Sequence, residues 1–436
     1  MKRIFFSDNN SLVPDREIKI IVEKLSSQKE RMKSGVEKRY ETDYASLYAP
    51  FDQDARHIIK KEIARVSNYD PSLIVVIGIG GSNLGTKAIW QAMQGFCNTA
   101  QKIEVCYADT VDPEFSACLI KKVENILINN KTVALVVATK SGTTTETIAN
   151  FELLLGILKK YRPDNYFQFV TIITDHQTPL YDIAVHHNFG LLSVPKKVGG
   201  RFSTLSAVGL FPLGLMGIDV DALCDGAASI IRDEIVDEKT NDSAQSAAIN
   251  YWHYINGKPM RDIFLFSVLL EGIGHCYRQY IGESLGKQFD VQKKEVRVGI
   301  TPLVSIGTID LHSVGQLYYG GPRDKNTTFI TVKKMRADVH VPQMNEFDSC
   351  VKNIQGISFS AIMNAVISGV KDSYENEGLP FTSIELPEIS SFYLGQLLQF
   401  AMIETMFVGY LLNINPFDQP HVELYKQETR KILAHE

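Results

Sequence analysis

Hydroxyl side chains are concentrated between residues 139 and 145 (TKSGTTT). Five hydroxyls, one glycine and one lysine lie there, between an apolar run and a helical pattern. Hydroxyls and the free N–H groups of a helix N-terminus donate hydrogen bonds to an anion, and lysine adds positive charge. One hydroxyl is enough to cap a helix, so capping by Thr144 or Thr145, the simpler interpretation, accounts for only part of the segment. No Asp- or Glu-rich segment accompanies it to hold Mg²⁺, which favours a sugar monophosphate over a nucleoside triphosphate.

Two glycine-rich turns offer further binding surfaces. Residues 78–85 (GIGGSNLG) follow an apolar run and let a ligand approach the backbone closely. Their spacing matches neither the dinucleotide-binding GxGxxG nor a GK[ST] phosphate loop. Residues 199–203 (GGRFS) place Arg201 on a Gly-Gly turn, where a rigid guanidinium suits a developing oxyanion. A tight strand-to-helix turn and a surface ion pair are the structural alternatives for the two segments.

Acid–base chemistry is offered by three further side chains. Gln279 and Glu283 lie four residues apart in a helical pattern, so they share one face, and a glutamate there suits a general base. His312 lies in a predicted loop, and the histidines and cysteines of the chain are not spaced as metal ligands. Lys426 falls in the last predicted helix. Each residue also has a non-catalytic interpretation. Glu283 could be a solvated surface residue, His312 a loop residue without a chemical role, and Lys426 an exposed side chain.

The composition is that of a folded globular protein. The chain has 436 residues, of which 44% are apolar and 22% charged, and this excludes a disordered or fibrous protein. A net charge of -5 argues against sequence-independent nucleic-acid binding, which needs a basic face. Six cysteines without a CxxC pair predict free thiols in a reducing cytoplasm. The N-terminus lacks the apolar segment of a signal peptide. Residues 394–412 include Gln396, Gln399 and Glu404, so we expect a buried helix there and no membrane span.

The elements that must position these side chains alternate between strands and helices. Apolar, β-branched runs predict strands at 73–79, 102–108, 133–138, 167–174 and 191–194. Helical patterns lie between them at 86–93, 113–123, 146–161 and 180–187. This alternation predicts a doubly wound parallel sheet over residues 60–200. Ligands bind beyond the carboxyl ends of such strands, where the glycine and hydroxyl segments follow.

A second α/β domain is expected over residues 201–393. It opens with a helical stretch to about residue 255, followed by strand candidates at 263–270, 296–306, 328–333 and 382–386. Residues 1–60 are rich in Lys and Glu and predict helices that pack outside the domains. Residues 394–436 predict two closing helices, the second of which carries Lys426.

Taken together, the motifs resemble the phosphoglucose isomerase family, from Gly78 to Lys426 and in the family's order. Residues 199–209 (GGRFSTLSAVG) and 417–426 (FDQPHVELYK) match its two signature segments, and the length resembles the short bacterial form. The resemblance implies two sugar-isomerase-type (SIS) domains and the reversible conversion of glucose 6-phosphate to fructose 6-phosphate, in glycolysis and gluconeogenesis. It also implies a cytoplasmic homodimer whose active sites are shared between subunits, and no cofactor or metal.

The resemblance also implies residue roles. Glu283 matches the base that moves a proton between C2 and C1, and Arg201 the group that stabilises the cis-enediolate. His312, reaching the site of the second subunit, and Lys426 match the pair that opens the sugar ring. The remaining implied substrate contacts fall into a phosphate loop and a sugar-lining set: Thr139, Lys140, Ser141 and Thr144; Gly81, Ser82, Gly200, Gln279 and Gln419.

The sequence departs from the family pattern at two positions, and two alternative functions remain open. His421 stands where the family usually has glycine, which predicts either a strained turn or a side chain near the pocket. Thr139 replaces the commoner serine, a change that keeps the hydroxyl. A non-catalytic sugar-phosphate sensor would be expected to lose Glu283, Arg201, His312 or Lys426, and all four are present. A dual isomerase that also accepts mannose 6-phosphate stays open.

Overall fold

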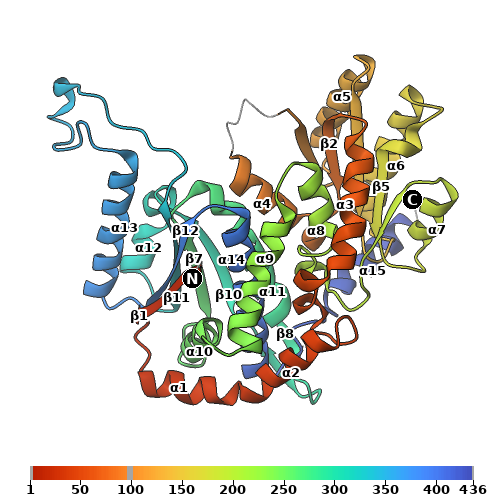
Figure 1. Cartoon of the computed structure of the whole chain (residues 1–436). Helices are drawn as coiled ribbons and strands as arrows, with labels where there is room; N and C mark the ends of the chain where they lie inside the picture. Colours follow the sequence, from red (N-terminus) through yellow and green to blue (C-terminus); the bar gives the residue numbers. More distant parts are fainter. Residues whose placement is uncertain (1–2, 96–101, 435–436) are drawn as a thin grey trace.

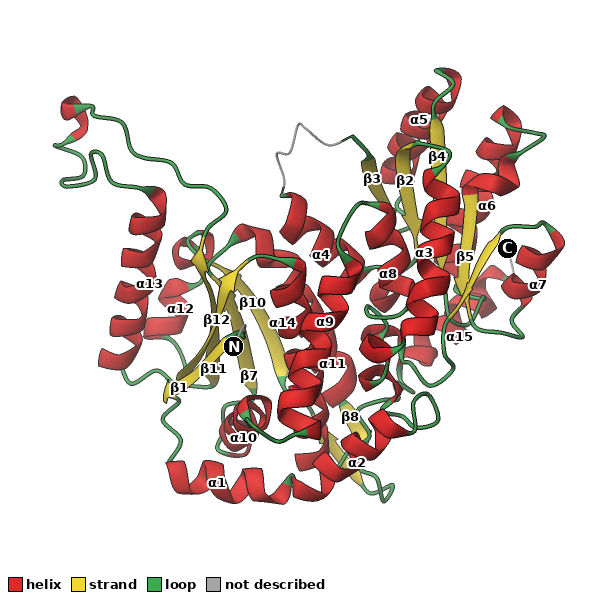
Figure 2. Ribbon diagram, in the orientation of Figure 1, coloured by secondary structure: helices red, strands yellow, loops and turns green. Residues whose placement is uncertain are grey.

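The computed structural model describes residues 3–95 and 102–434. Within them the chain forms two five-stranded sheets and a small hairpin. Figure 2 shows the two sheets side by side, with a layer of helices between them. The predicted fold class, two α/β sheets with additional helices, is confirmed.

The first sheet is parallel throughout, in the order β3-β2-β4-β5-β6. Alternate residues of β2 face opposite layers: Leu73 and Val75 pack toward α5, α6 and α7, while Ile74 and Val76 pack toward α3, α4 and α8. Burial of both faces explains why the strands read as unbroken apolar runs. The strands are β2 (Pro71–Ile77), β3 (Glu104–Ala108), β4 (Thr132–Ala138), β5 (Val170–Thr174) and β6 (Gly190–Ser193). The helices are α3 (Gln53–Ser67), α4 (Leu84–Gln94), α5 (Pro113–Ile128), α6 (Thr145–Tyr161), α7 (Pro179–His186) and α8 (Ala207–Leu215).

The second sheet has the order β1-β12-β11-β7-β10 and is parallel except for β1, which runs antiparallel to β12. Helices α12 and α13 cover one face, where they meet an aromatic cluster on β7 and β11. The strands are β1 (Phe5–Asn10), β7 (Met260–Leu265), β10 (Thr301–Ile306), β11 (Lys325–Lys334) and β12 (Phe381–Glu388). The other helices of this half are α9 (Val220–Ile231), α10 (Asp242–Ile255), α11 (Glu271–Leu285), α12 (Gly315–Gly320) and α13 (Phe359–Asn376).

The N-terminal segment departs from the prediction of helices alone. Helices α1 (Asp15–Lys24) and α2 (Ser26–Glu37) are present, but β1 precedes them as an edge strand. Its sequence, FFSDNN, has too few apolar residues to be recognised, because an edge strand is covered on one side only and leaves Phe5 65% exposed. The neighbouring backbone is anchored where the Ile4 N–H donates to Gln396 Oε1 at 2.9 Å.

One predicted strand, 296–306, is two strands. β9 (Glu295–Val298) pairs with β8 (Lys287–Phe289) in the hairpin, and β10 continues into the second sheet. Within β9, Arg297 adopts a positive φ of 47°, where the register of the β8–β9 pair is irregular. The hairpin is a separate two-stranded sheet, and its Lys287 donates to the carbonyl of Asp418.

The closing helices differ sharply in burial. α14 (Ser391–Leu411) is long and apolar enough by composition to cross a membrane, yet 89% of its most apolar window is buried in the molecule. The expected buried helix is thus confirmed. Its Glu404 pairs with Arg261 at 2.8 Å, which satisfies both charges in the core. α15 (Val422–Leu433), labelled in Figure 1, contains no buried residue among those described.

Candidate functional site

Two glycine turns meet between the sheets. The first, Gly80–Ser82, follows β2, and the second, Gly200–Phe202, precedes α8. A Cβ on Gly81 would lie 2.3 Å from the carbonyl carbon of Gly200, so no larger residue fits there. Gly80 has a φ of +56°, which glycine adopts without strain. The close contact brings the predicted Gly81, Ser82, Gly200 and Arg201 segments together.

Helix α11 supplies the candidate base. Glu283 lies one turn after Gln279, whose Nε2 donates to Glu283 Oε1 at 3.2 Å. The guanidinium of Arg201 approaches from the second glycine turn, with Nη1 3.6 Å from Glu283 Oε2. The carboxylate keeps a third of its side-chain surface exposed, whereas Arg201 keeps 2%. Glu283 therefore remains accessible to a ligand while its neighbours are fixed.

Arg201 is held by hydrogen bonds on several sides. Its Nε donates to Ser284 Oγ at 2.7 Å and its Nη1 to Gln419 Oε1 at 3.0 Å. Its Nη2 donates to the carbonyls of Pro416 and Asp418. Burial lowers the pKa of Arg201, and the nearby Glu283 opposes that shift. A guanidinium remains charged after such a shift, so it presents a fixed cation. We call Arg201, Gln279, Glu283 and Gln419 the carboxylate–guanidinium cluster.

Lys287 links the helix that carries Glu283 to the loop that carries Asp418. Its Nζ donates to the carbonyls of Glu283 and Asp418, both at 2.8 Å. It also lies 3.5 Å from Asp418 Oδ1. The end of α11 is thereby tied to the loop that carries Gln419.

The hydroxyl segment forms a tight loop ahead of α6. Thr139 Oγ1 and Thr144 Oγ1 lie 3.0 Å apart, and the Thr143 N–H donates to Ser141 Oγ at 3.3 Å. Thr144 is the N-cap residue, but its side chain makes no capping hydrogen bond. Capping therefore does not occupy these hydroxyls, and Ser141 and Thr143 are exposed.

Two lysines that sequence reasoning overlooked lie near this loop. Burial lowers the pKa of Lys140, and the positive charges of Lys197 and Lys196 lower it further, while Asp175 opposes them. Lys197 is itself paired with Asp43 at 2.8 Å. A phosphate dianion would relieve the repulsion among the three lysines. The available signal was the Lys196-Lys197 pair just ahead of the Gly199-Gly200 turn.

Among the described residues, His312 and Lys426 do not take part in the hydrogen bonds of the cluster. His312 is exposed in a short turn, Ile309–His312, at the end of β10. Lys426 Nζ donates to Glu423 Oε1 of its own helix at 2.8 Å. Within residues 3–95 and 102–434, no hydrogen bond or ion pair joins either side chain to Glu283 or Arg201. The hydrogen-bond network of the cluster therefore includes neither of these two predicted site residues.

His421 is not strained. Its φ is -75°, an ordinary helical value, so the strained-turn alternative is wrong. Its Nε2 lies 2.9 Å from Gln288 Oε1 on β8. The imidazole thus faces the hairpin at the rim of a neighbouring cleft.

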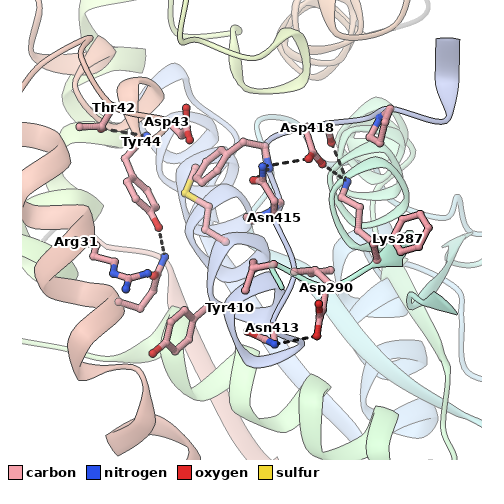
Figure 3. Close-up of a pocket in the computed structure, with 18 of the residues that line it drawn as sticks. Arg31, Thr42, Asp43, Tyr44, Lys287, Asp290, Tyr410, Asn413, Asn415 and Asp418 are labelled. Atoms are coloured by element: carbon pink, nitrogen blue, oxygen red, sulfur yellow. Dashed lines mark hydrogen bonds and ion pairs between the residues drawn. The ribbon is translucent and has the colours of Figure 1, made fainter. Parts of the chain in front are cut away.

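This cleft, of about 680 Å³, lies between α2, residues 41–44, the β8–β9 hairpin and residues 413–421 (Figure 3). Lys287 and Asp418 line it, whereas Arg201 and Glu283 do not. The loop around Asp418 therefore separates the cleft from the carboxylate–guanidinium cluster.

Metal ligands and thiols are the remaining reactive groups. In the part of the chain that the structure describes, no three His, Cys, Asp or Glu side chains gather as metal ligands. The five described cysteines, Cys106, Cys118, Cys224, Cys276 and Cys350, are free. Cys97 lies outside the described residues. Metal independence stays a prediction.

Comparison with solved structures shows which known proteins share this fold. The structure of a hypothetical protein from Thermus thermophilus superposes with a TM-score of 0.86 at 27% identity, covering 99% of this chain and 100% of that one. A glucose-6-phosphate isomerase from Chlamydia trachomatis gives 0.82 at 23% identity, covering 100% of this chain and 89% of that one. Tagatose-6-phosphate ketose/aldose isomerase from Escherichia coli shares the fold more distantly, with 0.51 at 15% identity over 88% of this chain and 95% of that one. The fold is that of the SIS-type phosphosugar isomerases.

Sequence relatives narrow this class to one family. The model of the family described as phosphoglucose isomerase matches residues 69–436. Glucose-6-phosphate isomerase of Methanocaldococcus jannaschii is 34% identical over 81% of this chain and 82% of its own length. A Thermus thermophilus enzyme of that name is 31% identical over 86% of this chain and 87% of its own length. The chain belongs to the phosphoglucose isomerase family.

Proposed function

We propose that the protein is a glucose-6-phosphate isomerase, which interconverts glucose 6-phosphate and fructose 6-phosphate. Family membership supports the substrate. The observation that carries the proposal is the placement of an accessible Glu283 carboxylate 3.6 Å from the buried guanidinium of Arg201. A base beside a fixed cation suits proton transfer through an enediolate.

The proposed reaction needs no redox partner. In the open-chain aldose, Glu283 removes the C2 proton, the C1–C2 double bond forms, and negative charge develops on O1. Arg201 faces that charge from a position fixed by Ser284 and Gln419. Glu283 then returns its proton to C1, and a proton moves from O2 to O1 to give the ketose. His312 and Lys426 are proposed to exchange the ring-opening protons at O5 and O1.

The hydroxyl loop is proposed to hold the phosphate. Thr139, Lys140, Ser141 and Thr144 supply hydroxyl and ammonium donors, and Lys196 and Lys197 add charge nearby. Gly81, Ser82 and Gly200 would let the sugar approach the backbone of the two packed turns. Gln279 and Gln419 would contact the sugar hydroxyls.

A homodimer with shared active sites is proposed because one chain leaves His312 exposed and without a hydrogen bond or ion pair to Glu283 among the described residues. Residues 335–358 support association, since they project as an arm from the second half (Figure 1). The arm carries exposed apolar side chains, among them Val339, Met344 and Phe347. We also propose that the enzyme is cytoplasmic, works without a metal, and divides into domains near residues 60, 200 and 393.

The test is an assay of the purified chain with glucose 6-phosphate in D2O, following fructose 6-phosphate and deuterium at C1. We expect turnover that EDTA does not reduce, and Glu283→Gln should lower it by at least about 10²-fold. Glu271→Gln, at the opposite end of α11, is the matched control and should stay active. A parallel assay with mannose 6-phosphate measures dual specificity. Binding of sugar phosphate without turnover by the wild type would instead identify a sensor.

A further inference from the structure

A carboxyl group without an assigned role lies beneath the His312 loop. Asp262, on β7, is fully buried. Its Oδ1 accepts a hydrogen bond from Ser305 Oγ at 3.0 Å, and its Oδ2 has no hydrogen-bond partner. Burial raises the pKa of Asp262 to about 7 and Asp310 adds to the rise, while the hydroxyls of Ser305 and Tyr318 and, less strongly, the charge of Lys325 oppose it. Burying a carboxyl group costs folding free energy unless hydrogen bonds compensate for the lost water, and Oδ2 of Asp262 has none among the described residues.

The hydrogen-bond chain continues across the loop. Ser305 is the penultimate residue of β10, and Tyr318 lies in α12, on the other side of residues 307–314. Ser305 Oγ and the Tyr318 hydroxyl lie 2.8 Å apart. When Asp262 is ionised, Ser305 donates to it, and the Ser305 oxygen accepts from Tyr318. The direction of donation therefore runs from Tyr318 through Ser305 to Asp262.

A second carboxylate fixes the loop internally. Asp310 Oδ2 accepts from the Ile306 N–H and its Oδ1 from Ser313 Oγ, both at 2.7 Å. Ser313 directly follows His312. Asp310 thus ties the residue next to the exposed imidazole to the end of β10.

We propose that Asp262, Ser305 and Tyr318 form a buried latch that joins the two ends of the loop 307–314 and so positions His312. The inference rests on the proposed function only for the role of His312. Asp262 and Tyr318 are positioning residues, because they act through the loop and touch no substrate. Strand β10 before the loop and helix α12 after it are held by one chain of hydrogen bonds, and Asp310 orders the turn between them.

Tyr318→Phe tests the latch with the smallest change. It removes one hydroxyl and keeps the ring against Phe264. We expect kcat to fall about tenfold and KM to change less than about twofold, since a net hydrogen bond is lost and the acid–base group is displaced. Tyr374→Phe is the matched control, because Tyr374 is buried in the same aromatic cluster outside the latch. Its kcat should remain that of the wild type.

Two further variants separate positioning from general destabilisation. Asp262→Asn keeps an acceptor for Ser305 and should retain kcat, whereas Asp262→Ala should behave like Tyr318→Phe. In a His312→Ala background, Tyr318→Phe should lower kcat no further, because the side chain that Tyr318 helps to position is absent. Equal losses in both backgrounds would overturn the proposal.

Hydrogen exchange gives a readout that does not depend on activity. Amides of residues 306–314 should exchange about tenfold faster in Tyr318→Phe than in the wild type, while those of β7 change little. Tyr374→Phe should leave that segment unaltered. Unchanged exchange in Tyr318→Phe would refute the latch even if the protein proved to have another activity. Faster exchange in a protein without isomerase activity would retain the latch and refute the proposed function.

Discussion

The carboxylate–guanidinium cluster is more extensively hydrogen-bonded than the pair His312 and Lys426, and its Arg201 is more buried than either. Arg201 is 4% exposed and bonded to Ser284 and Gln419. His312 is exposed at the end of β10, and Lys426 lies on a surface helix, where it pairs with Glu423 of the same helix. The residues proposed for proton transfer, Glu283 and Arg201, are thus held in place within one chain. The residues proposed for ring opening, His312 and Lys426, lie on surface elements.

Location in the fold explains this difference. α11 and the two glycine turns lie between the sheets, where close packing fixes each side chain. α15 contributes no buried residue among those described, and its Leu424, Tyr425 and Ile432 are each more than half exposed. An amphipathic helix with an uncovered apolar face gains stability when another surface covers it. This uncovered apolar face supports the proposed association of two chains.

Arg201→Lys, a change within the carboxylate–guanidinium cluster, should give the largest loss of kcat. A lysine cannot make the fork of bonds to Ser284, Gln419 and the 416–418 carbonyls, so the cation near Glu283 is misplaced. We expect kcat to fall about 10²- to 10³-fold. Arg297→Lys, at a 71% exposed side chain, is the control. A loss smaller than about tenfold would mean that the fixed geometry is unimportant.

Lys426→Ala, a change in the pair proposed for ring opening, should lower kcat by a smaller factor. If Lys426 acts only in ring opening, kcat with the cyclic sugar should drop by about 10²-fold, while deuterium exchange in the pre-opened sugar is retained. Lys431→Ala removes a lysine from the same helix, paired with Glu428 at 2.7 Å, and should be silent. Loss of exchange in Lys426→Ala would assign this residue to proton transfer instead.

The phosphate loop should give the mildest effect, visible in pH dependence. Burial and the neighbouring Lys196 and Lys197 lower the pKa of Lys140, so Lys140 loses its charge at a lower pH than a free lysine. Affinity for the phosphosugar should therefore weaken as pH rises toward 10.5, the ordinary lysine value. Lys140→Arg should flatten the rise in KM, because arginine stays charged. A KM that is equally pH-dependent in both proteins would exclude Lys140 from phosphate binding.

Sequence patterns predicted the elements whose two faces are buried. The Val, Ile and Leu runs of β2, β4 and β5 leave little alternative to core strands, and the glycines of residues 78–81 and 199–200 mark turns that must pack closely. β1 was missed because an edge strand needs few apolar residues. The proximity of Lys196 and Lys197 to Lys140 depends on the folded turn, and local sequence does not reveal it.

A mixing experiment tests most directly whether the complete site requires two chains. Glu283→Gln and His312→Ala, each inactive as a homodimer, are unfolded together in equal amounts and refolded. Random pairing makes about half of the dimers hybrid, and in a shared-site hybrid one of the two sites carries neither defect. Activity should therefore return to about a quarter of the wild type. If no activity returns while mass measurement confirms hybrid dimers, Glu283 and His312 serve the same site from one chain, and the shared-site account is wrong.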